Sequence, residues 1–161
     1  MIAARPADIN PPPRVMAVPR FARLFRLAAG LHIDKMDLRR YSDFVNGKLY
    51  DLLVCGAETA KSHGRNVVLP TDLPIAKGLR TCINTFRDLN EQIDLAPILN
   101  QLGARPPIDA VFNKEIEKQL PEIMGGLSVA LARSFKILDP ELKNPQTTHW
   151  QRSFQIFDLL L

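Results

Sequence analysis

The chain is poor in cysteine, and this scarcity excludes some classes of protein. Its 161 residues include two cysteines, Cys55 and Cys82, which form no CxxC pair and no cluster with histidine. Small disulfide-stabilised scaffolds and zinc modules depend on several closely spaced cysteines. Both cysteines also stand in apolar stretches with helical periodicity. The sequence therefore predicts two buried free thiols and no metal site.

Long hydrophobic runs are also missing. The opening stretch MIAARPADINPPPRV has no apolar core of the kind that a signal peptide needs, and no later stretch has the length required to cross a bilayer. We therefore expect a cytoplasmic or nucleoid-located protein without a membrane partner.

The sequence also lacks the residue patterns typical of enzymes. His32, His63 and His149 show neither the spacing of metal ligands nor a recognisable nucleophile partner. Gly125 and Gly126 belong to no GxxxxGK[ST] or GxGxxG loop. We expect no catalysis, no cofactor and no small-molecule substrate.

What the chain does carry is an uneven distribution of charge. The formal net charge is +4 and the sequence pI is about 9.3. Residues 16–80 hold eleven basic and six acidic groups, whereas residues 81–161 hold eight basic and ten acidic groups. The basic excess therefore belongs to the first half, which permits contact with a polyanion there.

The first half reads as three helices after a proline-rich tail. Four prolines and the lack of apolar periodicity predict disorder for residues 1–16. A short helix is expected from Pro19 to Gly30, and a long one from Asp37 to His63, with apolar residues at steps of three and four. A third helix is expected to begin after a cap at Thr71.

The second half repeats this order of short, long and final helices. Asp94 is expected to cap a short helix, a long helix is expected over Asn113–Leu138, and Asn144 is expected to cap the last helix. The expected starts of the long helices differ by 76 residues and those of the final helices by about 75. These offsets indicate structural duplication with little residue identity between the halves.

Two features of the second long helix leave alternatives open. Pro121 either kinks the helix or marks a start near Leu120. Gly125 and Gly126 each cost roughly 1 kcal/mol in a helix interior, which indicates either a tight crossing, with Tyr50 over Gly125, or a locally unwound segment.

Several strings resemble known proteins. The segment AVPRFARLFRLAAG, the long helix and GRNVVLPTDL resemble an archaeal-type histone, and RRYSDFVN, GGLSVALARSFKI and LKNPQT resemble the bacterial DUF1931 family. The resemblance extends over Val18–Leu161 and implies an all-α pair of histone folds, packed head to tail as an intramolecular pseudodimer. It implies a first fold over residues 17–90 and a second over residues 91–161, forming one compact unit.

The histone resemblance also implies residue roles in phosphate binding. Arg65 matches the arginine of the histone loop, and Asp72 matches the aspartate that pairs with it. Arg65 either faces a phosphate or simply joins the loop to the following helix. Asn66 and Val67 replace the lysine and threonine of the histone loop, which weakens the implied DNA contact.

Further cations match basic positions or lie in the loops that a head-to-tail pair would bring together. Arg23 and Arg26 match positions of the first histone helix, and Arg20 precedes them by one turn; all three are equally explained as solvent-facing arginines. One end of the pair would combine Lys35 with Lys143, and the other would combine Arg65 with Arg105.

We therefore expect weak binding to double-stranded DNA through its phosphate backbone, without sequence preference. The alternative is a histone-fold interaction module that pairs with itself or with another protein and does not bind DNA. The replaced loop residues and the acidic second half favour this alternative.

Overall fold

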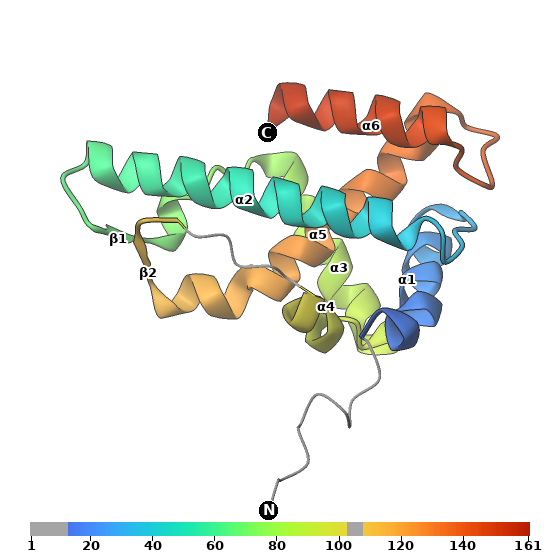
Figure 1. Ribbon diagram of the computed structural model, residues 1–161, viewed down its shortest axis with the longest axis horizontal. Helices are drawn as coiled ribbons and strands as arrows, with labels where there is room; N and C mark the ends of the chain where they lie inside the picture. Colours follow the sequence, from blue (N-terminus) through green and yellow to red (C-terminus); the bar gives the residue numbers. More distant parts are fainter. Residues whose placement is uncertain (1–12, 103–107) are drawn as a thin grey trace, which may run out of the picture.

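The computed structural model describes residues 13–102 and 108–161, with side chains described for residues 18–100 and 108–161. The chain is predominantly helical, as expected (Figure 1). In chain order the elements are α1 (Pro13–Ala29), α2 (Leu38–Ser62), β1 (Val67–Val68), the 3-10 turn η2 (Pro70–Asp72), α3 (Lys77–Ile93), α4 (Ala96–Leu102), β2 (Val111–Phe112), α5 (Lys114–Leu138) and α6 (Thr147–Leu160).

Helix α1 begins earlier than the sequence predicts. It starts at Pro13 and continues through Pro19, which was expected to be its first residue. Proline fits a first helical turn because its missing N–H would have no partner there, and this explains the start at Pro13. Pro19 costs the helix one backbone hydrogen bond. The predicted tail therefore overlaps the helix at residues 13–16, and its remaining part lies outside the described residues.

Helix α2 follows the molecule's long axis (Figure 1), and its bounds agree with the sequence prediction within a residue. The Asp34 carboxylate accepts hydrogen bonds from the backbone N–H groups of Met36, at 2.7 Å, and Asp37, at 3.2 Å, just before the helix. Gly64 ends it with a φ of +72°, a left-handed conformation that glycine adopts without strain.

Helix α5 is the central element of the core. The Asn113 side chain accepts a hydrogen bond from the Glu115 N–H, so the helix begins where the sequence predicts, and it runs unbroken through Pro121. Both the alternative start near Leu120 and the unwound segment at the glycines are therefore wrong. Every residue from Ile123 to Val129 is buried.

The two glycines of α5 mark a close crossing with α3, and the expected partner Tyr50 is wrong. A Cβ built on Gly125 would stand 2.2 Å from Cγ of Phe86, and one built on Gly126 would stand 2.4 Å from Cγ1 of Ile83. Tyr50 instead lies on α2 with 44% of its surface exposed. The glycines allow the backbones of α5 and α3 to approach more closely than side chains would permit.

Three predicted helix caps are wrong. Thr71 lies inside η2, and α3 begins six residues later, at Lys77. Asp94 ends α3 in a left-handed conformation, while the Asn90 side chain accepts hydrogen bonds from the two N–H groups that precede and open α4. Helix α6 begins after Gln146, two residues beyond the expected cap at Asn144. The residues that precede α3 and α6 make no side-chain cap hydrogen bond, whereas the start of α4 is closed by the side chain of Asn90.

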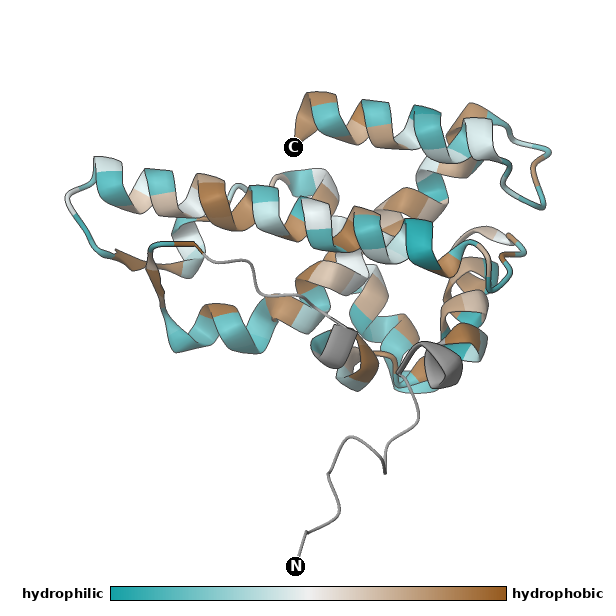
Figure 2. Ribbon diagram, viewed as in Figure 1, coloured by the Kyte–Doolittle hydropathy of each residue, from teal (hydrophilic) through white to brown (hydrophobic). Residues whose placement is uncertain are grey.

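Helix α6 packs across the first half of α2 through aromatic rings. Phe44 of α2 stacks on Phe154 at a centroid distance of 5.2 Å and meets Phe157 edge to face. Trp150 lies 4.9 Å from Phe135 of α5. Figure 2 shows hydrophobic bands along α2 and α5 that alternate with hydrophilic ones, as expected for helices with one buried side.

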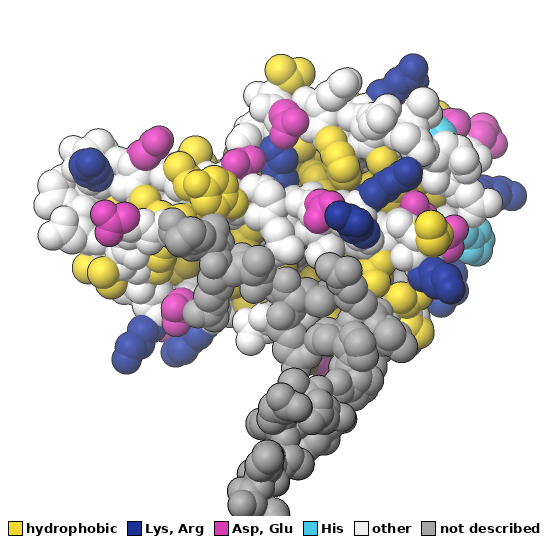
Figure 3. Space-filling view, viewed as in Figure 1, with side chains coloured by type: hydrophobic (Ala, Val, Ile, Leu, Met, Phe, Trp, Pro, Cys, Tyr) yellow, Lys and Arg dark blue, Asp and Glu magenta, His cyan; other side chains and the backbone are white. Residues whose placement is uncertain are grey.

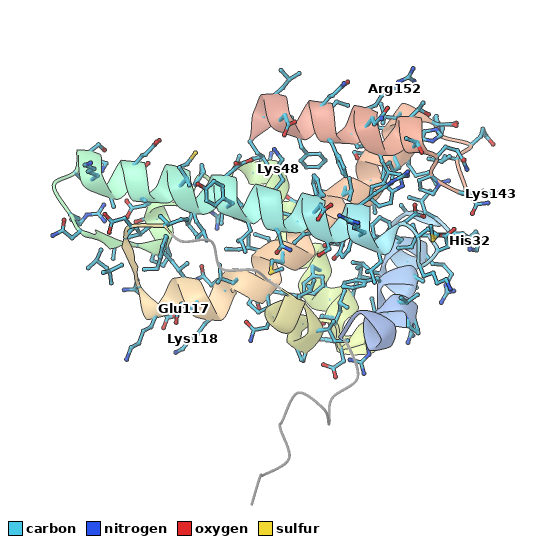
Figure 4. All side chains as sticks on the ribbon, viewed as in Figure 1. His32, Lys48, Glu117, Lys118, Lys143 and Arg152 are labelled. Carbon is cyan, nitrogen blue, oxygen red and sulfur yellow. The ribbon has the colours of Figure 1, made fainter. Side chains whose placement is uncertain are left out.

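An ion pair also joins α6 to α2. Lys48 is buried on α2 and donates to Asp158 of α6 at 2.5 Å and to Asp51 at 3.2 Å (Figure 4). Burial disfavours the charged lysine, but the hydrogen bonds to both carboxylates outweigh it and raise its pKa. The buried ammonium is thus paired, as an interior charge needs to be.

Both cysteines are free thiols, as predicted, although Cys55 is only partly buried. Over residues 13–102 and 108–161 no helix has the length and hydrophobicity needed to span a bilayer. The same residues contain no group of three histidine, cysteine or acidic side chains arranged to hold a metal ion.

Candidate nucleic-acid interface

The two halves of the chain meet at both ends of the molecule. At one end β1 pairs in parallel with β2, with Val67 opposite Val111 and Val68 opposite Phe112. We call this the strand end. At the other end the His32 N–H donates to the Lys143 carbonyl at 2.7 Å, which joins the loop 30–37 to the loop 139–146. We call this the loop end.

Lys35 and Lys143, the two cations predicted to meet at one end, lie on the two loops that the His32–Lys143 hydrogen bond joins. Both side chains are exposed. Arg40, at the start of α2, donates to the Thr147 hydroxyl at 2.9 Å and so fixes the first turn of α2 against the first turn of α6. Figure 4 shows Lys143 and His32 close together at this end, with Arg152 of α6 above them.

Two of the three predicted cations of α1 have structural partners. Arg20 donates to the Asp94 carbonyl at 3.0 Å, and Arg23 donates to the Gln92 carbonyl at 3.4 Å. Both carbonyls lie at the C-terminus of α3. The last carbonyl groups of a helix have no partner within the helix, and the negative end of the helix dipole favours a positive side chain there. The two arginines therefore fasten α1 to α3.

Arg26 lies about one turn beyond Arg23 on α1, toward the loop end. Its side chain is exposed and makes no hydrogen bond or ion pair with another described residue. Arg20 and Arg23 are thus held by backbone carbonyls, whereas no described residue holds the guanidinium of Arg26.

At the strand end, Arg65 forms a bidentate ion pair with Asp72. Both N–O distances are 2.7 Å, and Asp72 also accepts from the Leu69 N–H at 2.7 Å. The Arg65 hydrogen bonds, together with that backbone bond, lower the pKa of Asp72 to about 2. A third bond, from Arg65 to the Val67 carbonyl at 3.2 Å, fixes the guanidinium in the loop. The geometry favours the structural reading of this arginine.

Other charges at the strand end are mixed in sign. Glu58, Lys61, Arg65 and Asp109 line one open groove of about 550 Å³ between α2 and the residues before β2. The predicted contact Arg105 lies outside the described residues. Among the residues that are described here, the exposed cations share this surface with acidic groups.

Sequence reasoning missed two cations that the fold brings to the loop end. Arg39 is exposed in the first turn of α2, and Arg152 is exposed on α6, two residues after the buried Trp150. Arg39 is the first residue of the RRYSDFVN string and follows the loop 30–37 closely in sequence, so the sequence alone could have placed it near that loop. Arg152 had no comparable signal, because its placement depends on how α6 packs.

Comparisons with known proteins agree on the fold. A crystal structure from Thermus thermophilus shares 49% identity, with a TM-score of 0.79 over 89% of this chain and 97% of that one. A 1.9 Å crystal structure from Aquifex aeolicus shares 20% identity, with a TM-score of 0.77 over 89% of this chain and 94% of that one, and supports the fold alone.

A curated protein of Aquifex aeolicus strain VF5, named "Uncharacterized protein", is 29% identical over 98 residues. The match covers 60% of this chain and 55% of that protein, so it spans about half the length of the curated relative. The family model described as "Domain of unknown function (DUF1931)" matches residues 21–158. The chain therefore belongs to the DUF1931 family.

Proposed function

We propose that the chain is a pair of histone folds in one polypeptide and that it binds double-stranded DNA through the phosphate backbone. The order of a shorter, a long and a further helix occurs twice, as α1–α3 and as α4–α6. Two contacts support a head-to-tail pairing of the halves: the loop after the first helix of each half contacts the loop after the long helix of the other. This double contact is the observation that carries the proposal.

Such an arrangement places cations from both halves on composite surfaces at the ends. Lys35 and Lys143 form one such pair, with Arg26 on the neighbouring helix. Lysine and arginine side chains that contact phosphates fix a protein on a duplex without reading its sequence. The proposal therefore implies weak, salt-dependent binding without catalysis, in the nucleoid, with DNA as the partner.

An anisotropy titration tests this proposal. Two labelled duplexes of equal length and unrelated sequence are titrated with the full chain at about 50 mM salt, where phosphate contacts are strong. We expect both duplexes to bind with affinities that agree within about twofold, as binding without base contacts requires. If neither duplex binds at this salt concentration, the proposal is contradicted.

The exposed apolar residues of α6 favour a second function, which is association with another copy or another protein. Leu159 and Leu160 are 85% and 76% exposed, and Ile156 is 39% exposed. Exposed apolar side chains that gather on one element are typical of contact surfaces. Sedimentation velocity over a hundredfold range of concentration tests self-association: a monomer throughout would contradict it, and a dimer that Leu160→Glu dissociates would support it.

A further inference from the structure

We infer, on the basis of the proposed DNA binding, that the duplex is held at the loop end alone and that Arg39 and Arg152 take part. The cations concerned are Arg26, Lys35, Arg39, Lys143 and Arg152. They come from α1, the loop 30–37, α2, the loop 139–146 and α6 respectively, and all five side chains are exposed. Neither half supplies this set by itself.

The packing of the loop end explains why the elements that carry these cations meet at one end of the molecule. The His32–Lys143 backbone bond joins the two loops, and the Arg40–Thr147 bond joins the first turns of α2 and α6. Phe25 packs against Trp150 at a centroid distance of 6.3 Å, which sets the end of α1 against α6. Figure 3 shows several Lys and Arg side chains on this side of the molecule.

Three of the four acidic side chains in the two loops are engaged in local contacts, and the fourth, Glu141, is exposed. The Asp34 carboxylate accepts from two backbone N–H groups, and Asp37 lies 3.9 Å from Arg40. Asp139 accepts from the Glu141 N–H at 3.2 Å and lies 3.7 Å from His149. Their negative charge is thus partly compensated within the protein, whereas the five cations make no ion pair among the described residues.

At the strand end Lys61 and Lys114 are exposed cations as well, but two other cations there have acidic partners. Arg65 is held by Asp72, and Lys118 pairs with Glu115 at 3.4 Å. The first residues of the two strands, Val67 and Val111, expose apolar side chains, with 40% and 62% of their surface accessible. Apolar residues there offer a phosphate no hydrogen bond. Figure 4 shows Glu117 beside Lys118 at the side of the molecule opposite Lys143.

A pair of matched triple variants tests this inference. The loop-end variant carries Arg39→Gln, Lys143→Gln and Arg152→Gln, and the strand-end variant carries Lys61→Gln, Lys114→Gln and Lys118→Gln. All six side chains are exposed, and each variant removes three positive charges. Circular dichroism at the start of each titration checks that both retain the wild-type helix content.

The expected result is a loss of affinity for a duplex of at least about tenfold in the loop-end variant and less than about twofold in the strand-end variant, because lost phosphate contacts weaken binding to every sequence alike. An equal loss in both variants would overturn the inference and leave the proposed DNA binding intact. Failure of the wild-type chain to bind DNA would overturn both.

Discussion

Gly125 of α5 lies directly against the ring of Phe86 of α3, closer than any side chain at position 125 would allow. A Cβ at this position would stand 2.2–2.4 Å from three ring carbons, which is well inside van der Waals contact. Phe86 is itself fully buried. This contact sets the separation of the two helices at the centre of the core.

The contact predicts that Gly125→Ala destabilises the protein. Alanine normally stabilises a helix by about 1 kcal/mol relative to glycine, but overpacking of a core costs typically about 1–3 kcal/mol. We expect the free energy of unfolding, measured by urea denaturation, to fall. Gly47→Ala is the matched control, because Gly47 lies in α2 with nothing within 4 Å of its added Cβ. That variant should gain up to about 1 kcal/mol. A stabilised Gly125→Ala variant would contradict the packing at Phe86.

The hydrogen bond between Tyr41 and Ser128 predicts that substituting its two partners lowers the free energy of unfolding by different amounts. Their hydroxyl oxygens lie 2.5 Å apart, and Ser128 also donates to the Met124 carbonyl at 2.7 Å, so Tyr41 is the donor to Ser128. Burial raises the pKa of the Tyr41 phenol, which keeps it protonated. Ser128→Ala leaves a buried donor unpaired, at a cost of about 1–3 kcal/mol, whereas Tyr41→Phe removes that donor and should cost about 1 kcal/mol.

Urea denaturation of both single variants and of the double variant measures this asymmetry. The double variant should be about as stable as Tyr41→Phe, because removing the phenol hydroxyl also removes the unpaired donor. A Tyr41→Phe variant that is clearly less stable than Ser128→Ala would show that the assigned direction of the bond is wrong.

The Arg65–Asp72 pair predicts a pH-dependent contribution to stability. The pKa of Asp72 in the folded protein is about 2, below its ordinary value of 3.8, so folding favours the carboxylate. This contribution is fully present above about pH 5 and is lost as the pH falls through 4 toward 2. Asp72→Asn should therefore lower the midpoint of thermal unfolding at pH 7, and the difference from wild type should shrink below pH 4.

An exposed aspartate provides the control for this pH dependence. Asp88 lies on the surface of α3, so Asp88→Asn should leave the midpoint at pH 7 close to that of wild type. If the difference between Asp72→Asn and wild type stayed constant from pH 7 to pH 2, the ion pair would not be the source of the lost stability.

The sequence predicted the long helices well and the short connections poorly. The bounds of α2 and α5 follow from many apolar residues in helical register, and Asn113 adds a local cap to α5. The expected cap at Thr71 failed because the chain forms a 3-10 turn there, in which the Asp72 side chain bonds the Leu69 N–H. The resemblance to histones pairs Asp72 with Arg65, but no pattern in the sequence shows that the Asp72 side chain also bonds the backbone before the turn.

The candidate interface was predictable to the same limited extent. The loops that carry Lys35 and Lys143 do contact each other, as the repeated order of helices suggested, while their joint role in binding phosphate stays a prediction. The bonds of Arg20 and Arg23 to the end of α3 were not predictable, since they depend on the packing of α1 against a helix about seventy residues away in sequence. The glycines indicated a close crossing, but the periodicity of one helix does not identify the helix that crosses it.

The salt dependence of DNA affinity is the most direct test of the proposed interface. Five cations that contact phosphates predict a slope of about −4 to −5 for log K against log salt concentration, which is a several-hundredfold loss of affinity between about 50 and 200 mM. The measurement is an anisotropy titration of one duplex with the wild-type chain at four salt concentrations in this range. A slope near zero, or no binding at the lowest salt concentration, would contradict DNA binding through phosphate contacts.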